Sequence, residues 1–237
     1  MLTSLNKFKE QIKIYKKLGL NERPFQYFFK WRNSLKNGAN SIDDQLPWIT
    51  FDAIKYLQKF LTSKSIVFEF GGGGSTLFFL KNQATVYTVE HDANWFKKLE
   101  EIVKEKKYNK WFGFFIEGEK EQIINNPDIA NPLHYATEDE FYRSYNFKNY
   151  SLKISEFENE FFDIVLVDGR SRPSCIHHSL DKIKLNGILL LDNSDRTYYL
   201  EQMKTEIEKK FTLVLSKYSP SPYSYDFTHT SIWIKNK

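Results

Sequence analysis

Four consecutive glycines, Gly71–Gly74, directly follow a mostly apolar run at 65–70. A run of this kind is typical of a buried strand, and a helix is expected to begin near Ser75. Glycines allow the backbone to turn tightly and allow a ligand to approach main-chain N–H groups closely. The segment therefore predicts a strand, a ligand-binding loop and a helix, and the alternative is a merely flexible turn.

The rest of the chain repeats this strand and helix order. Further strands are expected at 85–90, 111–116, 162–168 and 187–192, and further helices at 94–106, 173–184 and 198–210. The last two apolar runs, 211–217 and 230–235, have no helix between them and should form an antiparallel hairpin at the sheet edge. The pattern predicts an α/β fold with a Rossmann-like, doubly wound and mostly parallel sheet.

Two segments stand apart from this pattern. Residues 1–47 form an aromatic-rich arm. Before residue 40 this arm contains nine basic residues and only two acidic ones, Glu10 and Glu22. Apolar spacing predicts a first helix ending at Gly19, and a later helix should begin after Thr50 as its N-cap. The domain at 48–237 carries a polar, aromatic insertion at 118–160, which is interpreted as a lid or binding element, or else as a poorly ordered excursion.

The composition is that of a globular protein. A length of 237 residues fits one domain, and the 41% hydrophobic content argues against wholesale disorder. The longest aliphatic runs, 164–167 and 188–191, are too short to span a membrane, and the first ten residues lack the apolar block of a signal peptide. A cytoplasmic location is expected. The single cysteine, Cys175, has no partner for an internal disulfide.

The acidic residues near the glycines indicate the kind of ligand. Thr76 stands where the dinucleotide fingerprint requires a third glycine, which disfavours NAD. Glu69 would repel a pyrophosphate but suits a ligand with an ammonium group and a sulfonium centre, such as S-adenosylmethionine. Glu90, which ends the second strand, can accept hydrogen bonds from both ribose hydroxyls of an adenosine.

The chain resembles the class I S-adenosylmethionine-dependent methyltransferases over residues 48–237. Their first motif is an acidic residue, any residue and Gly-x-Gly, and an acidic residue closes their second strand. The resemblance implies a seven-stranded sheet with a reversed last hairpin. It also implies cofactor-binding residues around the methionine half, Glu69, Gly71, Gly73 and Ser75, at the ribose, Glu90, and at the adenine, His91 and Glu117.

Polar side chains end the fourth and fifth strands, which should meet near the cofactor. Asp168, Asp192 and Asn193 could converge there and offer oxygen ligands of the kind Mg²⁺ accepts. The arrangement is similar to that of the catechol and caffeoyl-CoA O-methyltransferases, whose metal is held by an Asp and an Asp-Asn pair at these places. The alternative is metal-free, with Asp168 as the catalytic base or a substrate ligand and Asp192-Asn193 as a turn.

The loop after Asp168 contains Arg170 and Arg172 instead of the lysine that those enzymes carry. The two arginines could bind an acidic acceptor by forked hydrogen bonds, or they could pair with Asp192, Asp195 or the acidic insertion. His177 and His178 are further candidates for the base, with surface or packing roles as the alternative.

These features together predict S-adenosylmethionine-dependent O-methylation of a small hydroxylated acceptor, acidic or sugar-like, with Mg²⁺ as a candidate cofactor. The other hypothesis is an RNA-directed methyltransferase, or a non-catalytic nucleic-acid-binding module, that uses the basic arm. The net charge of +4 is too mild to decide between them. A homo-oligomer is compatible with either hypothesis.

Overall fold

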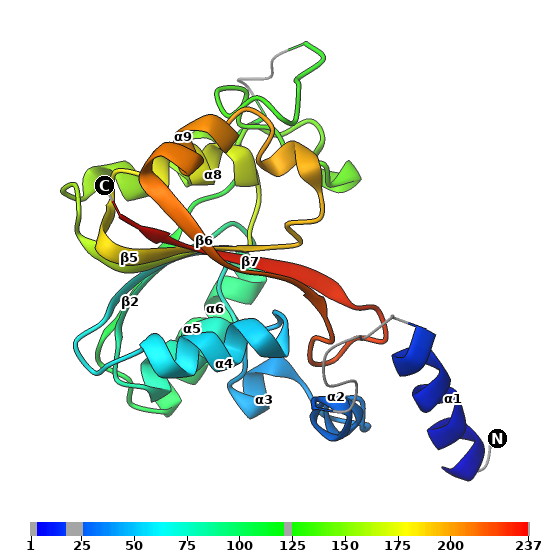
Figure 1. The fold of residues 1–237 in the computed structure, drawn as a ribbon. Coiled ribbons are helices and arrows are strands. Elements are labelled where there is room, and N and C mark those ends of the chain that lie inside the picture. The colour runs from blue at the N-terminus through cyan, green and yellow to red at the C-terminus, as the bar shows by residue number, and fades with distance from the viewer. Residues whose placement is uncertain (1–3, 18–25, 121–124, 237) are drawn as a thin grey trace.

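The computed structural model describes residues 4–17, 26–120 and 125–236. Its centre is a seven-stranded sheet (Figure 1). The strand order is β3-β2-β1-β4-β5-β7-β6. The strands are β1 (Ile66–Phe70), β2 (Thr85–Glu90), β3 (Trp111–Phe115), β4 (Phe162–Val167), β5 (Ile183–Asp192), β6 (Phe211–Ser219) and β7 (Thr228–Lys235).

Strands β1 to β5 are parallel, and β7 runs antiparallel between β5 and the edge strand β6. This confirms the predicted α/β class and the terminal hairpin. From β1 the chain adds β2 and β3 on one side and β4 and β5 on the other. The carboxyl ends of β1 and β4 therefore meet where the strand order reverses, which is where open α/β sheets bind ligands.

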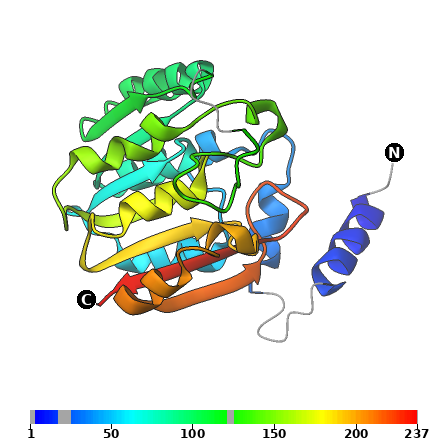
Figure 2. The ribbon, with the colours of Figure 1, turned by 90° about the horizontal axis from the view of Figure 1, so that it is seen from above.

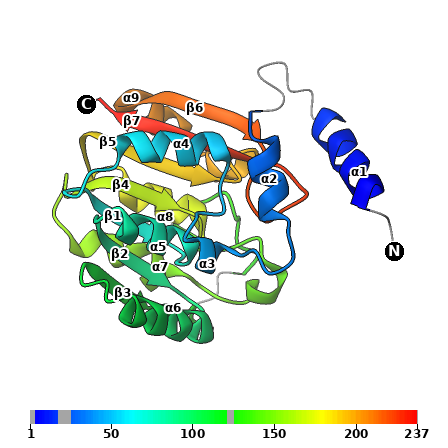
Figure 3. The same ribbon diagram turned by 90° about the horizontal axis from the view of Figure 1, so that it is seen from below.

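Helices cover both faces of the sheet (Figures 1 and 3). The face that carries α4, α5 and α6 also contacts α3, and the opposite face carries α7, α8 and α9. The bounds are α3 (Ser41–Asp44), α4 (Phe51–Phe60), α5 (Gly74–Lys81), α6 (Ala93–Glu105), α7 (Lys148–Leu152), α8 (Arg172–Ser179) and α9 (Lys204–Lys210).

Strand β4 shows why the central strands are apolar throughout. Ile164 and Leu166 pack into the core on one side of the sheet, while Val165 and Val167 pack into the core on the other. All four side chains are buried. A parallel strand covered on both faces needs a continuous apolar run, because no position along it faces solvent.

Two predicted helices are shorter than expected. The helix predicted over 173–184 ends at Ser179, because Ile183 is already paired with Phe162 in the sheet. The helix predicted over 198–210 is divided into a 3₁₀ turn, Thr197–Tyr199, and α9. The N-cap prediction is confirmed, since Thr50 Oγ1 accepts a hydrogen bond from the backbone N–H of Ala53 at 3.4 Å.

The described part of the arm contains α1 (Ser4–Lys17) and α2 (Phe28–Ser34). Figure 2 shows α1 beside the body of the protein. Tyr15 of α1 and Trp31 of α2 are buried against Phe227, which follows β6 in the chain. Trp31 Nε1 also donates a hydrogen bond to the carbonyl of Ser224 at 2.7 Å. Gly19, the predicted end of the first helix, lies outside the described residues.

The insertion is anchored to the face that carries α8. In its described part, 118–120 and 125–160, Phe147, Tyr150 and Ile154 are fully buried in the core of that face. Phe147 therefore anchors the insertion to this face. No helix among the residues described combines the length and the apolar character needed to cross a membrane.

Candidate functional site

The loop between β1 and α5 requires glycine at two positions. Gly71 has a φ of +86°, and a Cβ there would lie 3.1 Å from the carbonyl oxygen of Asp168. A Cβ on Gly72 would lie 2.7 Å from Cγ2 of Thr88 and 2.8 Å from Cδ2 of Leu99. The loop therefore sits tightly against β2, α6 and the end of β4, and its glycines serve more than flexibility.

Glu69 lies beneath this loop with no solvent exposure. Its carboxylate accepts hydrogen bonds from the hydroxyls of Ser75 at 2.8 Å, Thr88 at 2.7 Å and Thr76. Burial raises the pKa of Glu69 to about 7, although these hydrogen bonds oppose the shift. These hydrogen bonds connect the Glu69 carboxylate to the start of α5 and to β2. Contact of Glu69 with a ligand stays a prediction.

Glu90 fixes the same loop from the end of β2. Oε2 of Glu90 accepts the N–H of Gly72 at 3.0 Å, and Oε1 accepts the N–H groups of His91 at 2.7 Å and Asp92 at 2.9 Å. Burial acts to raise the pKa of Glu90, but the hydrogen bonds from His91 and from the backbone outweigh it and leave the pKa lowered. Glu90 is therefore ionised at neutral pH.

A cavity of about 250 Å³ opens above the loop and is called the glycine-loop cavity. Trp95 forms part of its wall, and its Nε1 donates a hydrogen bond to the carbonyl of Gly72 at 2.8 Å. Neither Glu69 nor Glu117 is among the lining residues, and the contact of Glu117 with an adenine stays a prediction. The lining consists of Ser41, Trp48, Gly71–Gly74, Ser75, Glu90, His91, Trp95, Asp168, Gly169, Arg170 and Arg172.

A second cavity, of about 420 Å³, lies at the carboxyl ends of β4 and β5 and is called the strand-tip cavity. Trp48 and Asp168 line both cavities, which are therefore neighbours. The lining of the strand-tip cavity consists of Trp48, Asp168, Asp192, Asn193, Asp195, Arg196, Ser221, Ser224, Asp226, Phe227 and Thr228.

Arg172, which is only 8% exposed, connects the ends of β4 and β5. Its Nη2 donates to Oδ1 of Asp168 at 3.0 Å, its Nε donates to the carbonyl of Gly169 at 3.1 Å, and its Nη1 donates to the backbone carbonyl of Asp192. Burial raises the pKa of Asp168, and the positive charge of Arg172 opposes that rise. Arg172 is thus the counter-ion of Asp168.

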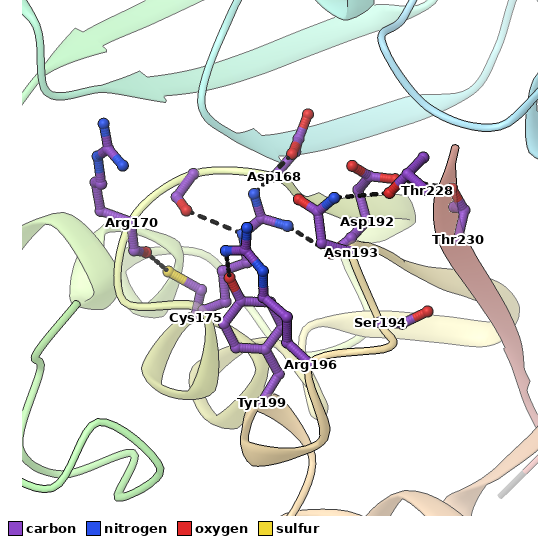
Figure 4. Close-up of polar contacts among 12 residues, drawn as sticks. Asp168, Arg170, Cys175, Asp192, Asn193, Ser194, Arg196, Tyr199, Thr228 and Thr230 are labelled. Atoms are coloured by element: carbon purple, nitrogen blue, oxygen red, sulfur yellow. Dashed lines mark hydrogen bonds and ion pairs between the residues drawn. The ribbon is translucent and has the colours of Figure 1, made fainter. Parts of the chain in front are cut away.

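The three predicted metal ligands are brought together at the strand-tip cavity (Figure 4). Asp192 is 4% exposed, and its Oδ1 accepts from the Thr230 hydroxyl at 2.8 Å. Asn193 turns its amide nitrogen to the Thr228 hydroxyl at 2.7 Å. Burial and the neighbouring Asp168 charge raise the pKa of Asp192 to about 7.

This donor set fits a divalent cation poorly. Asp168 already has Arg172 as its counter-ion. Within the described chain, no group of three or more acidic, histidine or cysteine side chains could hold a metal ion. Magnesium binding stays a prediction from the resemblance, and no chemical step is assigned to it.

Arg170 connects the glycine-loop cavity to the insertion. Its Nη1 lies 2.7 Å from Oδ2 of Asp139, its Nε donates to Nε2 of His91 at 3.0 Å, and its guanidinium lies 4.9 Å from the ring centre of Tyr142. Nδ1 of His91 in turn lies 2.8 Å from Glu90. The pairing of Arg170 with Asp139 of the insertion is the predicted alternative, whereas Arg172 pairs with Asp168 and contacts Asp192 only at its backbone carbonyl. Binding of an acidic acceptor stays a prediction.

The histidines considered as bases lie elsewhere. His178 stacks on Tyr135 with 5.9 Å between ring centres, and burial lowers its pKa to about 4. Neither His177 nor His178 is among the residues lining the two cavities. The stacking of His178 on Tyr135 favours the packing role for that histidine.

Sequence reasoning missed several lining residues. Trp95 belongs to the apolar face of the helix predicted at 94–106. It packs against the core and also contacts the glycine loop. Trp48 follows Pro47 at the start of the predicted domain and is 54% exposed, which is unusual for a tryptophan. Asp226 lies in the β6–β7 loop, and no local pattern marked it as part of the site.

The comparisons with known proteins support the fold. No protein-family model and no curated protein matches the chain. An rRNA methylase from Streptococcus thermophilus matches with a TM-score of 0.53 at 14% identity, over 78% of this chain and 95% of that one. A provisionally assigned O-methyltransferase from Klebsiella pneumoniae matches with a TM-score of 0.52 at 13% identity, over 97% and 89%.

A provisionally assigned methyltransferase from Streptococcus mutans, solved with S-adenosylhomocysteine, matches with a TM-score of 0.51 at 14% identity, over 77% of this chain and 97% of that one. Identities this low establish architecture and leave substrates open. The chain has the class I methyltransferase fold, as its resemblance predicted.

Proposed function

We propose that the protein is an S-adenosylmethionine-dependent methyltransferase that methylates a hydroxyl group of a small acceptor. The observation that carries the proposal is that Trp48 and Asp168 line both cavities. A donor in the glycine-loop cavity and an acceptor in the strand-tip cavity would meet at these two residues. Such alignment of two reactants supplies a large part of the catalysis in group transfer.

The glycine-loop cavity suits the cofactor. Its tight loop exposes the N-terminal end of α5, and the ionised Glu90 gives it a negative charge. Ser75, Glu90 and Trp95 would hold the methionine, ribose and aromatic portions of the ligand. When bound, S-adenosylmethionine supplies an electrophilic methyl group on a positively charged sulfur.

Asp168 is the proposed catalytic base. It is the acidic side chain at the boundary of the two cavities, and burial raises its pKa towards the range in which a carboxylate can accept a proton. Its Oδ1 is held by Arg172, which fixes the carboxylate. Oδ2 would take the hydroxyl proton as the acceptor oxygen bonds to the methyl carbon and the carbon–sulfur bond breaks, its electron pair remaining on the sulfur of the departing S-adenosylhomocysteine.

Titration calorimetry with S-adenosylhomocysteine tests the first part of the proposal. We expect saturable binding by the full chain and at least tenfold weaker binding by Glu90→Gln, which loses the charge facing the ligand. Glu105→Gln on α6 removes a charge outside the lining of both cavities and should bind normally. Absence of binding at millimolar ligand would contradict the proposal.

The second part needs a methyl acceptor. With an acceptor found by screening, Asp168→Asn should lower kcat at least a hundredfold while S-adenosylhomocysteine affinity changes less than threefold, since proton transfer by a placed side chain contributes about 10² to 10⁴. An unchanged kcat would remove Asp168 from the role of base and leave cofactor binding intact.

A further inference from the structure

The charges around the strand-tip cavity are strongly one-sided. Four aspartates line it against one basic residue, Arg196. The four are Asp168, Asp192, Asp195 and Asp226. We propose that the acceptor is a hydroxylated molecule that carries a protonated amine, bound by these carboxylates. This rests on the proposed function, because the cavity is identified as the acceptor site by its shared wall with the glycine-loop cavity and not by its charge.

The nearby cations are already paired within the protein. Arg172 is the counter-ion of Asp168. Arg196 forms an ion pair with Glu138 of the insertion and donates to the Tyr199 hydroxyl at 2.9 Å. Both guanidiniums are therefore held by acidic partners of the chain itself, which leaves neither free to bind an anionic acceptor.

Three of the aspartates lack a counter-ion. Asp192, Asp195 and Asp226 form no ion pair among the residues that the structure describes. Asp192 matters most, since it is almost fully buried and its hydrogen-bond partners, the Thr230 hydroxyl and the backbone of Asn193, carry no charge. Asp195 and Asp226 are exposed. A buried carboxylate without a charged partner is unfavourable in free energy, and a bound ammonium group would relieve that cost.

The rest of the lining suits an amine-bearing molecule with hydroxyl groups. The indole of Trp48 is 54% exposed at the boundary of the two cavities, and an aromatic face attracts an organic cation. Ser221, Ser224 and Thr228 add polar groups that can bind acceptor hydroxyls. A carboxylate or phosphate on the acceptor would instead face the unpaired aspartates and be repelled.

Matched probes test this inference. Full-length protein saturated with S-adenosylhomocysteine is titrated with two sets of hydroxylated compounds at pH 7, followed by saturation-transfer NMR. One set is 3-amino-1,2-propanediol, glycerol and glycerate, and the other is glucosamine, glucose and glucuronate. We expect the amine of at least one set to bind at least tenfold tighter than its neutral and anionic counterparts, and to be released by a screened acceptor but not by MgCl₂ at equal ionic strength.

Variants separate the site from the overall charge of the protein. In Asp195→Asn/Asp226→Asn the preference for the amine should fall at least fivefold. Glu100→Gln/Glu101→Gln removes two negative charges from exposed positions on α6 and should leave the preference unchanged. Both pairs should keep the same S-adenosylhomocysteine affinity, which shows that they are folded.

The outcomes distinguish the two proposals. If S-adenosylhomocysteine binds but the amines show no preference, if the anionic compounds bind better, or if Mg²⁺ displaces the amine, the inference is wrong and the proposed function stands. If S-adenosylhomocysteine does not bind, the proposed function fails and the inference fails with it.

Discussion

Arg172 donates a hydrogen bond from Nη2 to Oδ1 of Asp168 at 3.0 Å, and the same guanidinium donates to the backbone carbonyl of Asp192. One side chain therefore supplies positive charge at the ends of two neighbouring strands. The pair makes the acidic residues of the strand-tip cavity differ in whether their carboxylate has a counter-ion. Asp168 is neutralised and held in place, whereas Asp192 keeps a carboxylate without an ion pair.

Arg172→Ala should destabilise the protein. The substitution leaves Asp168 without its counter-ion in a half-buried position, and loss of one partner of such a pair costs about 3 kcal/mol. Urea denaturation followed by circular dichroism measures the change. As a control, Lys204→Ala removes an exposed pair with Glu208 and should cost less than about 1 kcal/mol. Equal effects of the two variants would show that Arg172 is an ordinary surface residue.

Glu69 should make the stability depend on pH. Burial raises its pKa from 4.5 to about 7, so the folded state binds a proton that the unfolded state releases between these values. The proton-linked stabilisation is complete below about pH 4.5 and is lost as the pH rises through about 7, for a total of roughly 3 kcal/mol.

The comparison of wild type with Glu69→Gln isolates this contribution, because Asp192 and the other groups titrate in both proteins. The free energy of unfolding of wild type relative to Glu69→Gln should fall between pH 5 and pH 8. A constant or rising difference would mean that Glu69 is ionised in the folded protein throughout this range.

Gly72→Ala should weaken binding of S-adenosylhomocysteine at least tenfold. The added Cβ would lie 2.7 Å from Cγ2 of Thr88, so the loop must shift away from β2. Thr88→Ser removes that methyl group and keeps the hydroxyl that bonds to Glu69. The double variant should therefore recover part of the affinity in calorimetry, and an equally weak double variant would argue against this contact as the cause.

Trp48 should report the negative potential of the strand-tip cavity. Subtracting the fluorescence of Trp48→Phe from that of wild type isolates its emission. Caesium ions should quench this emission several-fold more strongly than iodide at low ionic strength, because carboxylates concentrate cations around the indole. The preference should shrink in Asp195→Asn/Asp226→Asn. Stronger quenching by iodide would contradict a negative cavity.

The glycine loop and the ends of β4 and β5 show which parts of the site can be predicted from the sequence. The run at Gly71–Gly74 between a strand and a helix, with Glu90 after the next strand, is a short-range pattern, and the structure places Gly71–Gly74 and Glu90 around one cavity. Asp168 and Asp192 were expected to meet because parallel strands end at the same edge of a sheet, and both line the strand-tip cavity.

The order of strands and helices, the reversed hairpin and the position of the glycine loop can be predicted from the sequence, because they depend on periodicity and turn chemistry within a few residues. Long-range packing, by contrast, pairs Arg170 with Asp139 and Arg172 with Asp168 and brings Trp48 and Asp226 to the site. Electrostatic partners are set by distance in space. The charge left unpaired at a site is therefore known only once segments far apart in the chain have packed together.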